Sequence, residues 1–352
     1  MSYTHSVHVR PLLPDEESSG SCLSVSRQGN SLGLTTADGS EHRFFSPHCM
    51  SGLTQAEMYR CVAAPVADSV WRQEEAGRER ERGPKGESEV KSGAVVLLGP
   101  PGSGKTYAAE GVIEHPSARG VVFRLVGHAL SIGGTGCRVH LSGCAVALAE
   151  DLVFDLLVPS VHPTGLGRVP GSGLRSVAVT VPSVEGIIRR TRQTQRSIEA
   201  TLPRLTGSIM RVWIVALTRG TEKIGQVFVI DTPPIGRGGA VGLSAVTRAL
   251  RMGTISGTAV EQISGYPASP AMSTRSVLSA SSAGSSSSRS AYGGSLCRIL
   301  SLCAPENVSV VLCLSASRLS VSETTAALRY LEGVTGSDTY LARGERQRES
   351  TM

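Results

Sequence analysis

The chain has 352 residues, of which 40% are hydrophobic and 18% charged, and its formal net charge is +6. This length suffices for a substantial core, in one large domain or two ordinary ones, and the mild positive charge suits an acidic partner. The eight cysteines form no Cys-x-x-Cys pair and lack a matching histidine spacing, which favours reduced thiols over disulfides or zinc. We find neither a signal peptide nor an apolar run near the ~18 residues of a membrane span, and therefore expect a cytoplasmic protein without a membrane partner.

The N-terminal region predicts a strand followed by small hairpins. Residues 6–9 alternate between polar and apolar side chains, which is typical of a half-buried strand. Arg10 and Pro11 come next and predict a turn. Residues 15–40 are rich in Ser, Gly and Asp and show weak strand patterning, as small hairpins do.

A helix is expected after this region. Residues 54–57 (Thr-Gln-Ala-Glu) form a capping box, in which the Thr and Glu side chains satisfy free backbone N–H groups. Apolar residues then recur at helical spacing, with Pro65 as a kink. Residues 72–91 hold six basic and six acidic side chains. Since such a stretch cannot contribute to a core, we interpret it as a solvated surface insertion.

A glycine-rich loop separates the apolar run of residues 95–98 from the next predicted helix. Gly99 is followed by Gly104, Lys105 and Thr106, which is the spacing Gly-x-x-x-x-Gly-Lys-Thr. The glycines let backbone N–H groups turn toward phosphate oxygens, and the helix N-terminus adds positive potential. Lys105 can reach the outer phosphates, and the Thr106 hydroxyl can bind Mg²⁺. We predict a nucleotide site formed by Gly99, Pro100, Pro101, Gly102, Ser103, Gly104, Lys105 and Thr106.

The middle of the chain predicts five further elements. The helix after the loop is short, because Gly111 interrupts it, and a second helix begins near Gly120. Residues 138–148 alternate like a strand, and residues 150–157 predict a short helical turn. Residues 184–202 predict a helix whose basic face we interpret as solvated.

Two apolar strands, residues 211–217 and 227–230, are predicted to pair through the turn around Gly220. The second strand ends in Asp231. An acid at the end of such a strand is the second half of a P-loop site, where it supports the Mg²⁺ shell. We favour this role for Asp231 over that of a turn cap.

The C-terminal region predicts a helix at residues 242–252, a buried strand at residues 308–314 and a last helix that opens with a capping box at Ser320. Residues 273–290 contain ten serines and predict an insertion without regular structure. The sequence shows no heptad run and hence no coiled coil, so we expect a monomer.

We therefore expect a single domain over residues 1–335. Its surface insertions are residues 72–91 and 253–290, and residues 336–352 form a flexible polar tail.

Taken in order, these segments resemble a divergent kinesin motor domain over nearly the whole chain. Residues 8–12 are similar to the first strand and its Arg-x-Arg-Pro adenine motif, with His8 in place of the first arginine. Tyr107, directly after the P-loop Thr, matches the residue that packs near adenine. Residues 150–157 (Glu-Asp-Leu-Val-Phe-Asp-Leu-Leu) resemble the family's Asn-Glu-x-x-Tyr-Asp-Leu-Leu, and residues 323–330 resemble its closing helix.

The resemblance implies an α/β fold, a mixed and mostly parallel central β-sheet flanked by helices on both faces, in a P-loop NTPase. It implies ATP or ADP with Mg²⁺ as cofactors, microtubules as partner through the region from Ser244 to Cys303, a cytoskeletal location, and no nucleic acid. The adenine side is assigned to Arg10, Pro11 and Tyr107. The catalytic roles fall on Lys105, Thr106, Ser208 and Asp231, of which the last three hold Mg²⁺, Asp231 through water.

The departures from the family concern the two switches. Kinesin switch I reads Asn-x-x-Ser-Ser-Arg-Ser-His, and here Ser208 remains while the arginine becomes Gly207. Switch II reads Asp-Leu-Ala-Gly-Ser-Glu. Here Asp231 survives, the glycine becomes Pro234, which has no N–H, and the glutamate becomes Gly236. Losing the groups that position water predicts nucleotide binding with weak or absent hydrolysis.

Three hypotheses remain open. The chain is a microtubule-based motor ATPase, or a non-motile nucleotide-binding module with a structural or regulatory role, or another P-loop ATPase of the AAA type. The region from Ser244 to Cys303 has five arginines and one glutamate, a net charge of +4, which predicts weak and salt-dependent microtubule binding.

Overall fold

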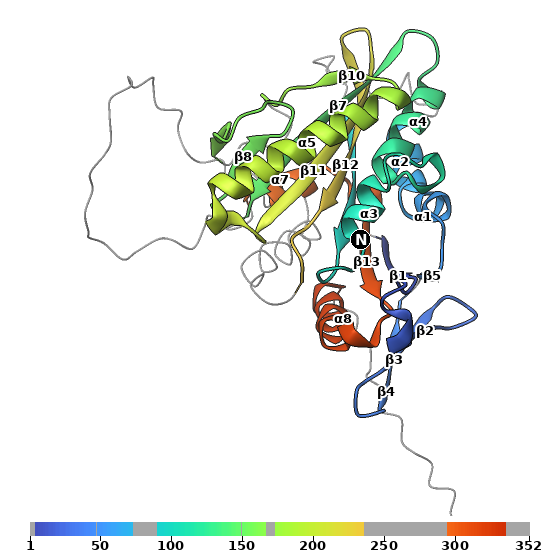
Figure 1. The fold of residues 1–352 in the computed structure, drawn as a ribbon. Coiled ribbons are helices and arrows are strands. Elements are labelled where there is room, and N and C mark those ends of the chain that lie inside the picture. Colours follow the sequence, from blue (N-terminus) through green and yellow to red (C-terminus); the bar gives the residue numbers. More distant parts are fainter. Residues whose placement is uncertain are drawn as a thin grey trace, which may run out of the picture.

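The computed structural model describes residues 4–46, 48–72, 90–148, 150–166, 173–235 and 294–335. Its centre is a ten-stranded sheet, drawn in Figure 1. In spatial order the strands are β5 (Cys49–Ser51), β1 (Thr4–Arg10), β13 (Val308–Ser315), β6 (Lys91–Leu98), β12 (Glu222–Asp231), β11 (Ile209–Arg219), β7 (Cys137–Ala147), β8 (Leu152–Asp155) and β9 (Gly165–Leu166), with β10 (Val177–Val179) beside β7.

The five neighbouring strands β5, β1, β13, β6 and β12 run parallel to one another. The pairs β12–β11, β11–β7, β7–β8 and β8–β9 are antiparallel. Parallel neighbours end at the same edge of a sheet, which is where ligands bind in open α/β folds. In the register of β6 and β12, Asp231 lies opposite Leu97. The end of β12 therefore lies beside the start of the glycine-rich loop. The predicted mixed sheet is confirmed.

Successive side chains of β6 point to opposite faces of the sheet and thereby contribute to two separate layers of the core. Ala94, Val96 and Leu98 are buried on one face of the sheet, and Val95 and Leu97 on the other. A strand buried on both faces reads as a continuous apolar run, which is why residues 94–98 carry no polar side chain.

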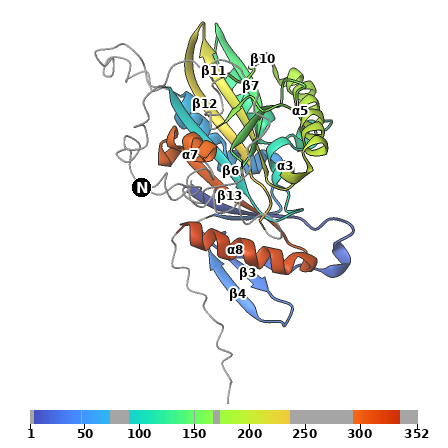
Figure 2. The ribbon, with the colours of Figure 1, turned by 90° about the vertical axis from the view of Figure 1, so that its left-hand side faces the viewer.

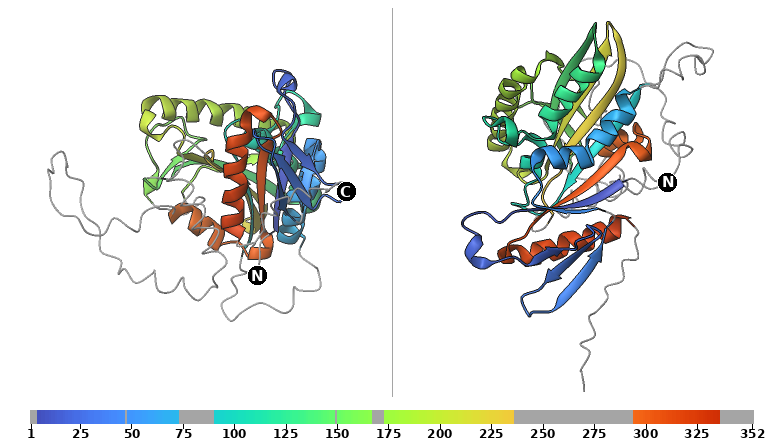
Figure 3. Two further views of the ribbon diagram at one scale, coloured as in Figure 1. Left: turned by 90° about the horizontal axis from the view of Figure 1, so that it is seen from below. Right: turned by 90° about the vertical axis from the view of Figure 1, so that its right-hand side faces the viewer.

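Helices cover both faces, as predicted. Figure 2 shows α5 and α7 on opposite sides of the strands. The face of Val95 carries α1 (Gln55–Val62), α2 (Ala64–Trp71), α3 (Lys105–Glu110), α4 (Val121–Gly133) and α5 (Val181–Thr201). The face of Val96 carries α7 (Gly294–Ser301), α8 (Val321–Thr335) and the small sheet β2 (Leu23–Val25), β3 (Ser31–Thr35) and β4 (Glu41–Phe45). Figure 3 shows α8 alongside this small sheet.

The first predicted helix forms, but as two helices. The Thr54 side chain accepts from the Glu57 backbone N–H, and the Glu57 carboxylate accepts from the Thr54 N–H, so the capping box is confirmed. The helix breaks at Ala63, and Pro65 lies in the first turn of α2, where its missing N–H costs nothing. The expected kink is thus a helix boundary.

The prediction of a helical turn at residues 150–157 is wrong, because this stretch contains the strand β8. Asp151 has a positive φ of 52° and turns the chain back sharply after β7. Residues 152–155 then pair with β7 in antiparallel register. Phe154 is fully buried among side chains of β7, α5 and the segment that leads into β11. Pairing with a neighbouring strand and burial on both faces outweigh the local helical preference.

Several expectations fall outside the described residues. They are most of the insertion at 72–91, the helix at 242–252, the serine-rich segment and the C-terminal tail. Among the helices of the described ranges, none combines the length and apolarity that a bilayer crossing requires.

The burial of Phe154 gives a test of β8. We expect Phe154→Ala to lower the free energy of unfolding by about 3–5 kcal/mol, because it leaves a cavity in a buried apolar cluster. The matched control is Phe45→Ala on β4, whose side chain is 53% exposed and whose loss should cost less than ~0.5 kcal/mol. Equal effects in urea unfolding would show that residues 152–155 are not packed as a strand.

Candidate nucleotide-binding site

The glycine-rich loop connects β6 to α3 with a backbone that residues other than glycine rarely adopt. Gly99, Gly102 and Gly104 have φ values of 149°, 70° and 94°. A Cβ at Gly99 would lie 2.3 Å from the Cys313 carbonyl oxygen and 2.5 Å from the Ser103 hydroxyl. The loop therefore packs directly against the end of β13, and its shape depends on Gly99.

Lys105 points back into this loop. Its ammonium donates to the carbonyl oxygens of Gly99, at 2.7 Å, and of Pro100, at 3.0 Å. The residue is 8% exposed, and this burial lowers the pKa of Lys105, against the opposing effect of Asp231. A buried ammonium needs hydrogen-bond acceptors. Phosphate oxygens accept hydrogen bonds, as do the two carbonyl oxygens that hold the Lys105 ammonium here.

Ser103 supplies a second observation on the fit of a phosphate. Its hydroxyl is buried and has no hydrogen-bond partner among the described residues. Buried hydroxyls without partners are rare in folded proteins. An unpartnered donor inside the loop fits a ligand oxygen, so the residues present suit a phosphate group.

Thr106 and Asp231 meet at the edge of the loop. The Thr106 hydroxyl donates to Asp231 Oδ2 at 2.7 Å. Burial raises the pKa of Asp231, while Arg211, the Thr106 hydroxyl and Lys105 act in the opposite direction. A hydroxyl and a carboxylate of this kind are the oxygen donors that Mg²⁺ prefers beside phosphates, so the two residues also fit the ion.

Hydrogen bonds hold the segment after β12 against the end of β6 and the start of the loop. Both the backbone N–H and the hydroxyl of Thr232 donate to the Leu97 carbonyl oxygen, at 3.2 and 2.8 Å. The Ile235 N–H donates to the Gly99 carbonyl oxygen at 3.0 Å. Pro234 stands between them without an N–H to offer a ligand. Gly236 lies outside the described residues.

Ser208 lies in the turn that joins the short helix η4 (Pro203–Leu205) to β11. Its hydroxyl donates to the Leu205 carbonyl oxygen at 2.8 Å. The neighbouring Gly207 has a φ of 80°, in the left-handed region. The structure thus brings Thr106 and Asp231 together, whereas the hydroxyl of Ser208 is engaged within its own turn.

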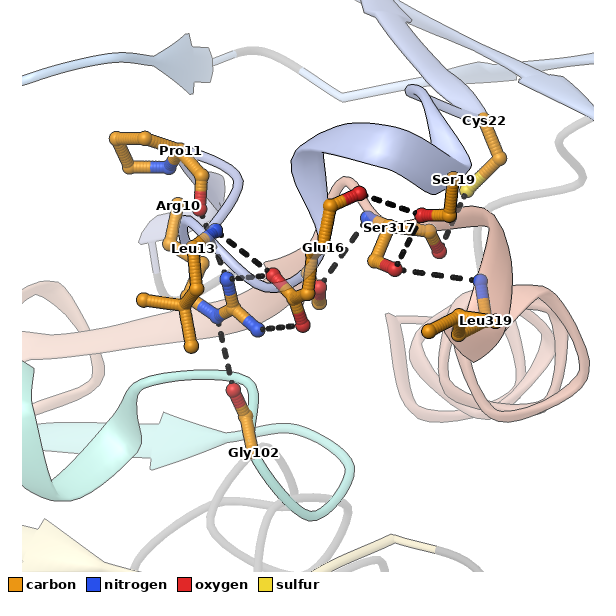
Figure 4. A network of polar contacts seen from close by, with 10 residues as sticks. Arg10, Pro11, Leu13, Glu16, Ser19, Cys22, Gly102, Ser317 and Leu319 are labelled. Carbon is orange, nitrogen blue, oxygen red and sulfur yellow. Dashed lines mark hydrogen bonds and ion pairs between the residues drawn. The ribbon is translucent and has the colours of Figure 1, made fainter.

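Arg10 connects the N-terminal strand to the loop, as Figure 4 shows. Its Nε donates to the Gly102 carbonyl oxygen at 2.9 Å. Its two terminal nitrogens each donate to a Glu16 carboxylate oxygen at 2.6 Å. The hydrogen bond from Arg10 lowers the pKa of Glu16 to about 2. Glu16 therefore positions the Arg10 side chain beside the loop, a role that the sequence analysis missed.

The other two residues assigned to the adenine side are exposed. Pro11 follows Arg10 directly, and its carbonyl oxygen accepts from Arg10 Nη1 at 2.8 Å. Tyr107 is 48% exposed on α3. Its carbonyl oxygen accepts from the Gln55 side chain at 2.8 Å, which ties α3 to α1.

A buried ion cluster at the far end of α3 was also missed. Glu110 is fully buried, and its carboxylate accepts from Arg192 Nε at 2.6 Å and from Arg211 Nη1. The interpretation of the α5 basic face as solvated is therefore wrong for Arg192. A charged residue at the start of the apolar strand β11 was the signal in the sequence, since a buried guanidinium requires an acid.

Comparison with known proteins bears on the fold. No protein-family model matches the sequence, and no curated protein matches it either. A solved structure described as that of a fast kinesin superposes with a TM-score of 0.65, over 99% of this chain and 99% of the other. The fold is that of a kinesin motor domain. The two chains are 18% identical, and at this distance the likeness concerns the fold alone. The resemblance inferred from the sequence is confirmed at that level.

The Arg10–Glu16 ion pair predicts a pH dependence of stability. Because the folded pKa of Glu16, about 2, lies below its ordinary value of 4.5, the pair stabilises the fold above about pH 4.5 and loses this contribution as the pH falls toward 2. We expect the difference in unfolding free energy between wild type and Glu16→Gln to shrink over that window. Glu17→Gln, at an exposed neighbouring site, is the control, and a difference for Glu16→Gln that stays constant with pH would contradict the assignment.

Proposed function

We propose that this chain binds ATP or ADP with Mg²⁺ at the loop between β6 and α3. The observation that carries the proposal is the convergence of Lys105, Thr106 and Asp231 at the carboxyl ends of β6 and β12. The fold supports it, since the description of the fast kinesin concerns its ATPase mechanism.

The residues at the site bind different parts of the nucleotide. Backbone N–H groups of the loop and the N-terminus of α3 surround the phosphates. The Lys105 ammonium exchanges the carbonyls of Gly99 and Pro100 for phosphate oxygens. Thr106 and Asp231 hold Mg²⁺, which neutralises charge on the phosphates when bound. Arg10, Pro11 and the exposed ring of Tyr107 provide the surface for the base.

We further propose that hydrolysis is weak or absent. Ser208 donates to its own turn, Gly207 offers no side chain, and Pro234 has no N–H. A site that lacks groups to orient water and stabilise developing charge loses about 10²–10³ in rate for each missing donor. The module is then a nucleotide-binding structural or regulatory protein.

A microtubule-based motor ATPase is the second candidate, and the coverage of the whole chain by a kinesin fold favours it. The fast kinesin's description includes interactions with microtubules. Here most of the region from Ser244 to Cys303 lies outside the described residues. Cosedimentation with microtubules at low and high salt decides the question of a partner, because a basic surface should bind only at low salt. No finding supports the AAA-type hypothesis.

Nucleotide binding is tested by removing the loop ammonium. We expect Lys105→Ala to weaken the binding of a fluorescent mant-ATP by about 100-fold. The variant loses two charge-assisted hydrogen bonds from the ammonium to phosphate oxygens, each of ~1.5 kcal/mol. Lys223→Ala on β12, whose ammonium donates to Gln226, is the matched control and should bind as wild type does. Equal affinity of the two variants would overturn the assignment of the site.

A further inference from the structure

The ion cluster at the end of α3 lies one strand away from the proposed Mg²⁺ site. Glu110 is the last residue of α3, the helix that begins with Lys105 and Thr106. Arg211 is the register partner of Asp231 in the antiparallel pair of β11 and β12. Arg211 therefore connects the cluster to the strand end that carries Asp231.

Arg211 interacts with two carboxylates, those of Glu110 and Asp231, and bonds to the first. Its Nη1 donates to Glu110 Oε1, and its Nε donates to Gln195 Oε1 at 2.6 Å. Toward Asp231 it acts through its charge, which favours the ionised carboxylate. No hydrogen bond joins Arg211 to Asp231 among the described contacts, and Asp231 Oδ2 accepts from Thr106 instead.

The arrangement has an electrostatic consequence for Mg²⁺. A fixed cation that pairs with a carboxylate competes with any metal that the carboxylate is to hold. The Glu110 carboxylate is fully buried and pairs with the Arg211 guanidinium. If that negative charge is removed, Asp231, its register partner on β12, is an acid to which Arg211 can turn, because a guanidinium that is 12% exposed is costly to leave unpaired.

We propose that Glu110 is a positioning residue for Mg²⁺: by binding Arg211, it keeps Asp231 available to the ion. The inference rests on the proposed nucleotide function, since Mg²⁺ enters the site with the phosphates. Glu110 also pairs with Arg192, so one carboxylate serves two guanidinium groups.

The test measures how mant-ADP affinity depends on free Mg²⁺, from EDTA to millimolar Mg²⁺, for four proteins: wild type, Glu110→Gln, Arg211→Gln and Arg189→Gln. We expect Glu110→Gln to raise the Mg²⁺ concentration for half-maximal tightening by about tenfold, because Arg211 then pairs with Asp231. Arg211→Gln removes the competing cation and should lower that concentration. Arg189 pairs with Glu114 and Glu185 on the exposed side of α5, so Arg189→Gln should match wild type.

The outcomes are distinguishable. A cluster with a merely structural role would lower the melting temperature of Glu110→Gln while leaving the Mg²⁺ requirement at the wild-type value, and that result overturns the inference. If Glu110→Gln does not fold, Arg211→Gln decides, and a Mg²⁺ requirement equal to or above that of wild type contradicts the proposal. Absence of mant-ADP binding by wild type at every Mg²⁺ concentration overturns the proposed function, and this inference with it.

Discussion

The ammonium of Lys105, buried against the carbonyl oxygens of Gly99 and Pro100, is the interaction on which the site depends. An ammonium out of water requires several oxygen partners. The loop supplies them only because its glycines adopt backbone angles that close it around the side chain. The same loop is held from outside by β13 at Gly99, by Arg10 at Gly102 and by Ile235 at the Gly99 carbonyl. Three separate parts of the chain thus maintain one loop.

The sheet explains why those parts meet. β6 lies between β13 and β12, and all three strands run parallel. Their carboxyl ends therefore deliver Cys313, Gly99 and Asp231 to one edge. The same neighbours also limit the chemistry, because the segment after β12 is bonded to Leu97 and Gly99 and contains Pro234. Under the proposed function, the residues that would hold phosphate come together at this edge, whereas Gly207 has no side chain and Pro234 no N–H with which to position water.

The sequence predicted the local parts of this site. The spacing from Gly99 to Thr106 is a local pattern that predicts the loop, although contacts from distant parts of the chain hold it. The apolar strand that ends in Asp231 predicts that this acid lies beside the loop. The side-chain partners of Glu110 were beyond reach, because Arg192 and Arg211 lie 82 and 101 residues away. β8 was missed for a similar reason, since its identity depends on pairing with β7 and on the burial of Phe154 rather than on local preference.

The fate of bound ATP tests the account most directly. Wild-type protein is mixed with γ-labelled ATP and Mg²⁺ under single-turnover conditions, with and without microtubules, and quenched over time after stoichiometric binding has been verified on the same sample. The account predicts that the bound nucleotide is recovered as intact ATP. Release of labelled phosphate at ~1 s⁻¹ or faster, a rate ordinary for enzymes, would contradict it and show that these switches position water after all.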